Sequence, residues 1–249
     1  MKICRFLRNA LLATILSSAW PAMAQDHAAT RYKVNLPPSA ELDYVVNARQ
    51  SGFAIEGNAR VAWHAASGQF TLETEMRAML LGKIMDAKTE GVIDEYGLAP
   101  VASSEKRFRK QTTTVSFNRE AKIIRFSGSD ATYPIKGGEQ DRNSAIWQLI
   151  AVARAAPAKF RPGSEWTFFV AGQRDAEPWV FRVAEHEKIQ TPLGDLQALH
   201  VIKAAPVQTQ KIDIWLAPSL EWYPARLRYT DPDGDFIEQS LVSMAKKPA

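Results

Sequence analysis

Alternation of apolar and polar residues fills most of the chain on both sides of one short helical pattern. From Glu41 to about Ile135, apolar side chains recur at every second position, as in Leu42, Tyr44 and Val46. This period is typical of strands with one buried face and one exposed face. Short polar breaks such as Ser67-Gly68 separate the runs, so we expect antiparallel strands joined by hairpins. The same alternation returns from residue 166 to residue 242.

Between the two β regions, the spacing predicts a helix over Asp141–Ala156, with Asp141 as its N-cap and Pro157 after its end. The apolar stripe expected to face the sheet recurs at three- and four-residue spacing: Ile146, Leu149, Ile150 and Ala153. Trp147 lies on the opposite side of this helix. It either fills a position at the rim of the core or belongs to a lid or contact surface.

The pattern predicts a mainly β protein with about a dozen strands. A sheet of that size must curl or close to protect its edges. We therefore expect a large curved antiparallel sheet or partial barrel, with one main α-helix packed on its concave side. The expected organisation is a single domain over residues 41–243, between a flexible tail at 25–40 and a C-terminal tail at 244–249.

The first 24 residues read as a cleaved signal peptide. Three bases precede the apolar stretch Ala10–Leu16, and the small residues Ala22-Met23-Ala24 precede the expected start at Gln25. The apolar stretch is too short to span a bilayer. Cys4 lies before it, where a lipid-anchoring cysteine does not occur. We expect a soluble periplasmic product without a lipid anchor or a transmembrane segment.

Cleavage changes both the charge and the cysteine content. The whole chain has 31 Lys+Arg against 27 Asp+Glu, and removal of the three signal-peptide bases leaves 28 against 27. A nearly neutral protein has no electrostatic support for a nucleic-acid partner. Cys4 is the only cysteine, so the mature chain has no disulfide bond.

No motif for catalysis or metal binding stands out. The chain has no Gly-x-Ser-x-Gly elbow, and its four histidines have no partner at ligand spacing. The acidic segment Asp231–Asp235 resembles a calcium loop, but its glycine is misplaced and strand patterns flank it, which indicates a hairpin turn. We expect no enzymatic activity, no metal and no cofactor.

Methionines cluster in the segment Met76–Met85. Methionine suits surfaces that accept apolar partners of variable shape, although a buried central strand is the alternative interpretation. If an apolar hollow exists, the helix should close it. The predicted ligand-binding residues are Met76, Met79, Leu81, Met85, Ile146, Trp147, Leu149 and Ile150.

A second candidate surface is the basic run at 106–110, which surrounds Phe108. One interpretation is a patch that binds lipid head groups or an acidic wall polymer. The other is a solvated strand whose charges discourage edge pairing.

Six short segments lie at turns, at strand ends and at the start of the helix: Tyr96-Gly-Leu-Ala-Pro100, Asp141-Arg-Asn-Ser144, Thr191-Pro-Leu-Gly-Asp195, Leu199-His-Val201, Ile214-Trp-Leu-Ala-Pro218 and Tyr223-Pro-Ala-Arg-Leu227. With these segments, the chain resembles the exported bacterial DUF3108 proteins over about 41–242. The pattern is also similar to the wider LolA/LolB-like group of periplasmic lipoprotein carriers and sensors. That likeness implies a curved sheet around an apolar hollow, although the carriers have several helices where this chain has one.

Two functions follow as hypotheses. The first is a non-enzymatic binding protein that holds a lipid, an acyl chain or a lipoprotein anchor between the sheet and the helix. The second is a scaffold or interaction module of the cell envelope, with a filled sheet interior, no ligand and a protein partner.

Overall fold

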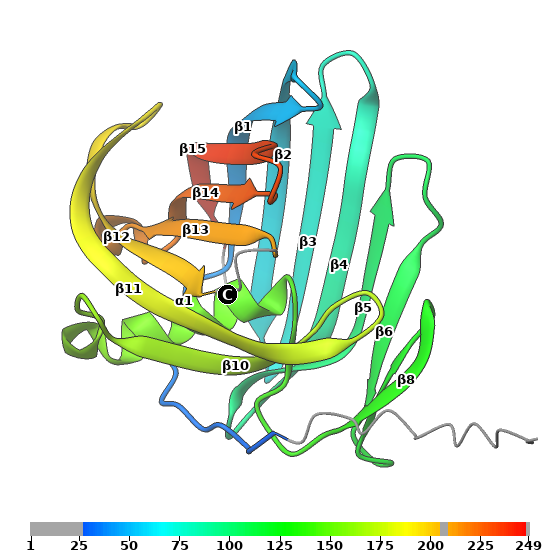
Figure 1. Cartoon of the computed structure of the whole chain (residues 1–249). Helices are drawn as coiled ribbons and strands as arrows, with labels where there is room; N and C mark the ends of the chain where they lie inside the picture. The colour runs from blue at the N-terminus through cyan, green and yellow to red at the C-terminus, as the bar shows by residue number, and fades with distance from the viewer. Residues whose placement is uncertain (1–26, 205–208, 248–249) are drawn as a thin grey trace, which may run out of the picture.

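The computed structural model describes residues 27–204 and 209–247, and within them one fifteen-stranded sheet curls around a single long helix (Figure 1). The predicted signal peptide, 1–24, lies outside the described residues. The strands before the helix are β1 (Ala40–Gln50), β2 (Phe53–Ala66), β3 (Gln69–Ala78), β4 (Gly82–Asp94), β5 (Gly97–Arg107), β6 (Thr113–Asn118), β7 (Ile123–Phe126), β8 (Ser129–Pro134) and β9 (Gln140–Asp141). Then follow α1 (Ser144–Ala155), the 3₁₀ turn η1 (Pro157–Lys159), β10 (Glu165–Ala171), β11 (Ala176–Thr191), β12 (Gly194–Ala204), β13 (Lys211–Leu216), the 3₁₀ turn η2 (Pro218–Leu220), β14 (Pro224–Thr230) and β15 (Phe236–Lys246).

Strand order in the sheet follows the chain with one exception at its centre. The order is β8-β7-β6-β5-β4-β3-β2-β1-β15-β14-β13-β12-β11-β10-β9, so the first strand pairs with the last. All of these pairs are antiparallel except β9 with β10. The predicted mainly β fold with a curved antiparallel sheet is confirmed. Fifteen strands replace the predicted dozen because short strands such as β9, with two residues, leave no readable alternation.

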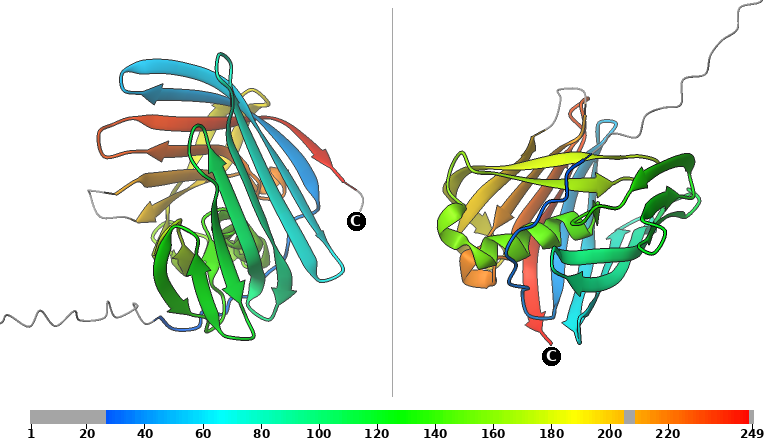
Figure 2. Two further views of the ribbon diagram at one scale, coloured as in Figure 1. Left: turned by 90° about the vertical axis from the view of Figure 1, so that its right-hand side faces the viewer. Right: turned by 90° about the horizontal axis from the view of Figure 1, so that it is seen from below.

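The predicted alternation places one face of each strand in the core. In β1, Leu42, Tyr44 and Val46 are buried in the main cluster. The sheet curls so far that its two ends meet, because Phe117 of β6 packs in one cluster with Phe169 of β10 (Figure 2). This second cluster closes the side of the curved sheet that the main core does not fill.

The helix is buried on more sides than its sequence stripe predicts. Leu149 and Ile150 are fully buried, as expected, but Trp147 is also only 5% exposed. Trp147 stacks on Trp63 of β2, with ring centroids 4.7 Å apart. Its predicted place at the rim of the core is therefore wrong, because the curled sheet also surrounds that side of the helix. Among the described residues, no helix has the length and hydropathy needed to cross a bilayer.

The N-cap of the helix lies two residues after the predicted one. Helical structure begins at Ser144, and Asn143 occupies the N-cap position without a side-chain bond. Asp141 instead lies in β9, where its Oδ1 accepts hydrogen bonds from the backbone N–H groups of Asn143 (2.9 Å) and Ser144 (3.4 Å). The carboxyl group satisfies the first turn from just outside the helix.

Gln148 fixes the helix to the sheet through its side-chain amide. It accepts a hydrogen bond from the N–H of Leu98 (2.9 Å) and donates one to the carbonyl of Tyr96 (2.7 Å). The turn between β4 and β5 must come close enough for both contacts, and a Cβ at Gly97 would lie 2.5 Å from the Gln148 amide. Glycine is therefore required there by both space and its φ of +104°.

The segment at 27–39, predicted to be part of a flexible tail, is packed against the protein. It crosses the helix (Figure 2), where the N–H of Asn35 donates to the carbonyl of Ala151 at 2.9 Å. Tyr32 makes edge contacts with Trp166 and Phe168 of β10. At the other end, β15 continues to Lys246, so the predicted C-terminal tail from residue 244 is also wrong. Both corrections reflect pairing and aromatic contacts between segments far apart in the chain.

Candidate functional site

A cavity of about 400 Å³ opens on the concave side of the sheet beside the start of α1. Its size falls within the range of typical small-molecule sites. The buried part of its wall is mainly apolar and aromatic, with Gln239 as a polar member, and comes from both halves of the sheet and from the helix: Tyr44, Val61, Leu72, Met76, Ile146, Trp147, Trp179, Pro224, Leu227 and Gln239. Inward-facing positions of β1, β2, β3, β11, β14 and β15 supply the strand residues, and α1 supplies Ile146 and Trp147.

Two tyrosines keep this wall uncharged. The Tyr44 hydroxyl donates a hydrogen bond to the carbonyl of Pro224 at 3.0 Å. Burial raises the pKa of Tyr44 and of Tyr229, which also lines the cavity. Both phenols therefore remain neutral at physiological pH, and the inner cavity offers apolar surface without fixed charge.

Charged residues gather at the mouth of the cavity, where the lining is more exposed. Arg142, just before the helix, donates to Gln210 (3.0 Å), and Gln210 donates to Asp231 (2.8 Å). Glu105 is paired with Arg107. Lys110 also lines the mouth and has no ion-pair partner in the described part of the chain.

Arg142 also lacks a direct ion pair in the described part of the chain. Its guanidinium lies 5.8 Å from the ring centre of Trp179, and no carboxylate pairs with it within residues 27–204 and 209–247. The three cations at the mouth, Arg107, Lys110 and Arg142, outnumber its two carboxylates, Glu105 and Asp231, by one, so the mouth favours a ligand with an anionic or strongly polar end.

The structure brings together four of the eight predicted ligand-binding residues. Met76, Met85, Ile146 and Trp147 all line the cavity. Leu149 and Ile150 are fully buried in the core behind it and do not reach its surface. No bound molecule tests the assignment, so a binding role for the four lining residues stays a prediction.

Met79 and Leu81 are predicted wrongly as cavity residues. Strand β3 ends at Ala78 and β4 begins at Gly82, so Met79-Leu80-Leu81 forms the tip of a hairpin. Their side chains are exposed by 74% for Met79 and 52% for Leu81. The unbroken apolar run is a turn, and neither a buried central strand nor a cavity wall.

Several cavity residues were not predicted. Tyr44 comes from β1, two strands away from Met76 in the sheet, Leu227, Tyr229 and Ile237 come from β14 and β15, and Arg142 comes from the turn before the helix. The alternation shows that the first three point inwards. Only the order and curl of the sheet bring them to the same cavity as Met76, and no local signal in the sequence encodes that.

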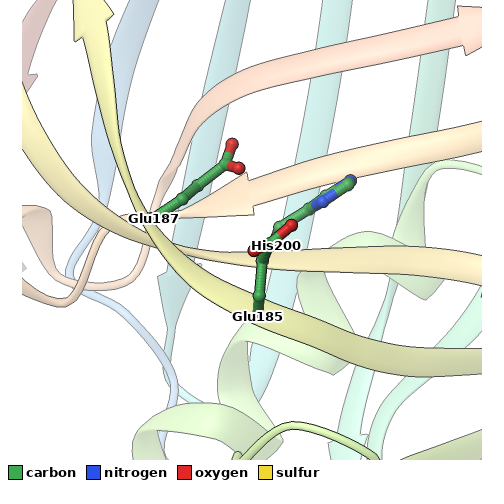
Figure 3. Close-up of side chains that lie close together, drawn as sticks. All are labelled: Glu185, Glu187 and His200. Carbon is green, nitrogen blue, oxygen red and sulfur yellow. The ribbon is translucent and has the colours of Figure 1, made fainter.

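A polar cluster of possible metal ligands lies on the opposite face of the sheet. Glu185 and Glu187 of β11 and His200 of β12 place one potential ligand atom each within 4.8 Å of one another (Figure 3). However, the Nε2 atom of His200 hydrogen-bonds Asp213 at 2.8 Å, and the Glu187 carboxylate accepts the indole N–H of Trp215. These contacts account for His200 and Glu187 without an ion, and we assign no metal to the cluster.

The acidic segment Asp231–Asp235 forms the turn between β14 and β15, as predicted. The N–H of Asp231 donates to the carbonyl of Asp235 (2.8 Å), and Gly234 has a positive φ of 88°. The carboxylates of Asp231 and Asp235 accept hydrogen bonds from Gln210 and Gln50, respectively. They are thus directed to neighbouring side chains.

Solved structures resemble the chain in fold. A β-barrel-like protein of the DUF1849 domain from Brucella abortus superposes with a TM-score of 0.57 at 13% identity, covering 86% of this chain and 100% of that chain. A DUF1329 family protein from Desulfovibrio piger matches with a TM-score of 0.32 at 7% identity, covering 85% of this chain and 86% of that one. Only the first supports an argument, and it concerns fold alone. Among curated proteins, none matches the chain.

The sequence profile of one family matches residues 43–242, which is most of the chain and close to the predicted domain. The profile spans β1 to β15, the helix and every strand that lines the cavity. The chain therefore belongs to DUF3108, a family described as proteins of unknown function.

Proposed function

We propose that the protein is a non-enzymatic periplasmic binding protein for an amphiphilic molecule. The ligand would be a lipid, a free acyl chain or the acyl anchor of a lipoprotein, with its apolar part in the cavity. The observation that carries this proposal is the cavity itself, with an apolar wall inside and unpaired cations at the mouth. Such a gradient from apolar to charged matches a molecule with a hydrocarbon tail and an anionic head.

The lining also supports binding over catalysis. None of the described lining residues is a serine, cysteine or histidine. Its two carboxylates, Glu105 and Asp231, accept hydrogen bonds from Gln173 and Gln210 at 2.8 Å each. General acid–base or nucleophilic chemistry needs an activated group within reach of the substrate. Both carboxylates of the lining are already engaged in hydrogen bonds to glutamine side chains. The alternative of a scaffold with a filled interior has less support, because part of the interior is hollow.

Two measurements test the proposal. Native mass spectrometry of the protein purified from the periplasmic fraction should detect a co-purified lipid. In delipidated protein, an environment-sensitive naphthylamine dye should bind with one site and be displaced by a fatty acid. Absence of both lipid and dye binding in the parent protein would refute the proposal.

A pair of variants on one strand localises the binding. Thr74 of β3 lines the cavity, so Thr74→Trp should fill it and weaken dye binding by roughly tenfold or more. Thr71 of the same strand points to the opposite face, and Thr71→Trp is the matched control that should bind the dye as the parent does. Equal binding by both variants would place the dye elsewhere.

A further inference from the structure

Three neighbouring hairpin tips expose large apolar side chains at one end of the sheet. The tips join β1 to β2, β3 to β4 and β5 to β6, and lie along the upper edge in Figure 1. Of seven exposed large hydrophobic residues in the described part of the chain, five are on these tips: Phe53 (74%), Met79 (74%), Leu80 (94%), Leu81 (52%) and Phe108 (40%). Single exposed apolar residues are ordinary, whereas a group on adjoining tips marks an interaction surface.

The tips form one connected rim. The N–H of Met79 donates to the carbonyl of Glu56 in β2 at 2.9 Å, which ties the first tip to the second. The N–H of Phe108 donates to the carbonyl of Ile84 in β4 at 2.8 Å, which ties the second to the third. Ile84 and Phe108 also line the cavity, so the rim borders its mouth.

The third tip adds positive charge. Lys106, Arg107, Arg109 and Lys110 surround Phe108 without any acidic residue between them. Only Arg107 has an ion-pair partner among the described residues, namely Glu105. β5 pairs with β4 as far as Arg107 but with β6 only as far as Glu105, so the basic run lies past the end of the β5–β6 pairing and continues into the loop. The bases are exposed and can contact anionic groups outside the protein.

We propose that this rim docks on an anionic lipid surface. Met79, Leu80, Leu81 and Phe53 would enter the boundary between head groups and acyl chains, while the bases at 106, 109 and 110 contact lipid phosphates. Apolar side chains flanked by basic residues are the combination that favours interfacial binding to anionic membranes. Docking in this way brings the cavity mouth close to the lipid. The proposal does not depend on whether the cavity holds a ligand.

Flotation with vesicles tests the docking. The purified protein should float with phosphatidylcholine vesicles that contain about a third phosphatidylglycerol, less with pure phosphatidylcholine, and less at high salt. The double variant Leu80→Glu/Leu81→Glu should lower partitioning by roughly tenfold or more, because two charged groups would have to enter the interface. Replacing Lys106, Arg109 and Lys110 by Gln should abolish the preference for the anionic lipid.

Leu193 provides the matched control. It is an exposed leucine (42%) on the separate hairpin tip between β11 and β12, so Leu193→Glu should float as the parent does. All substituted residues are exposed, and melting temperatures should match the parent. Failure of the parent to float, equal flotation of Leu80→Glu/Leu81→Glu, or an equal loss with Leu193→Glu would overturn the proposal. Self-association through the rim without vesicle binding would do the same. Dye binding to the cavity is measured separately, so either proposal can fail alone.

Discussion

At the scale of single residues, Asp141 connects the sheet, the helix and the cavity. The residue is 2% exposed, and its Oδ1 accepts hydrogen bonds from the Thr89 hydroxyl (2.9 Å) and from the backbone N–H groups of Asn143 and Ser144 at the start of the helix. Oδ2 has no partner within the described residues. Burial raises the pKa of Asp141, and the hydrogen bonds lower it by less. The next residue, Arg142, forms part of the cavity mouth.

The raised pKa gives a prediction with a definite sign. The folded state binds the proton of Asp141 more readily than the unfolded state, so stability falls as pH rises through the interval above the ordinary value of 3.8. Asp141→Asn keeps an acceptor for Thr89 without a buried charge and should be at least as stable as the parent at neutral pH. Asp141→Ala leaves these donors unpaired and should lose about 1–3 kcal/mol. Urea unfolding at pH 5 and pH 7 measures both effects. Equal losses for Asn and Ala would mean that the negative charge itself is required.

At the scale of elements, α1 separates a filled region from a hollow one. Ile146 lines the cavity, whereas Leu149, three residues later, is fully enclosed. The hairpin tip of β3 and β4 lies outside both regions, since Met79 is exposed. Substitutions of the same kind at these three positions should therefore have three different outcomes.

Glutamine at each position tests this division. Leu149→Gln buries an unpaired amide and should cost about 1–3 kcal/mol more than Ile146→Gln, where water in the cavity can bind the amide. Ile146→Gln should instead weaken binding of the apolar dye. Met79→Gln should change neither property. One thermal melt and one titration for each variant suffice. A similar loss of stability at Ile146 and Leu149, with no dye binding in the parent, would show that the interior is filled.

Sequence patterns predict what each element buries, but not what lies across from it. The alternation in β1 and the stripe of α1 correctly place Leu42 and Leu149 in the core, because period fixes which face turns inwards. The tip at Met79-Leu80-Leu81 lacks the polar residues that usually mark a turn, and only Gly82, with a φ of +69°, signals it. The cavity itself depends on the curl of the whole sheet, which joins residues from its two halves.

At the scale of the molecule, the acidic turn and the cluster at His200 bear on metal dependence. The carboxylates of Asp231 and Asp235 bind Gln210 and Gln50, and His200 binds Asp213. Hydrogen bonds from His200 and Lys211 lower the pKa of Asp213 despite its burial. Each group thus has a protein partner that would have to be released before a cation could bind.

We therefore expect the melting temperature to be unchanged by calcium or by a chelator, because no bound ion contributes linkage stability. Differential scanning fluorimetry with calcium, zinc and a chelator measures this. A rise of several degrees with calcium that Asp233→Ala removes would contradict the prediction. A rise with zinc that His200→Ala removes would assign a metal to the cluster of Glu185, Glu187 and His200.

Pairing of the first strand with the last has a consequence for the order of folding. Asp43 and Ser243, 200 residues apart, are joined by a hydrogen bond between β1 and β15. Strands β2 to β8 can form from consecutive hairpins, but the centre of the sheet needs the end of the chain. Contacts of such high sequence separation slow folding, and an unpaired β1 edge is prone to aggregation until β15 arrives. A chain that emerges gradually must therefore remain incomplete, with its cavity unformed, until its final strand has been delivered.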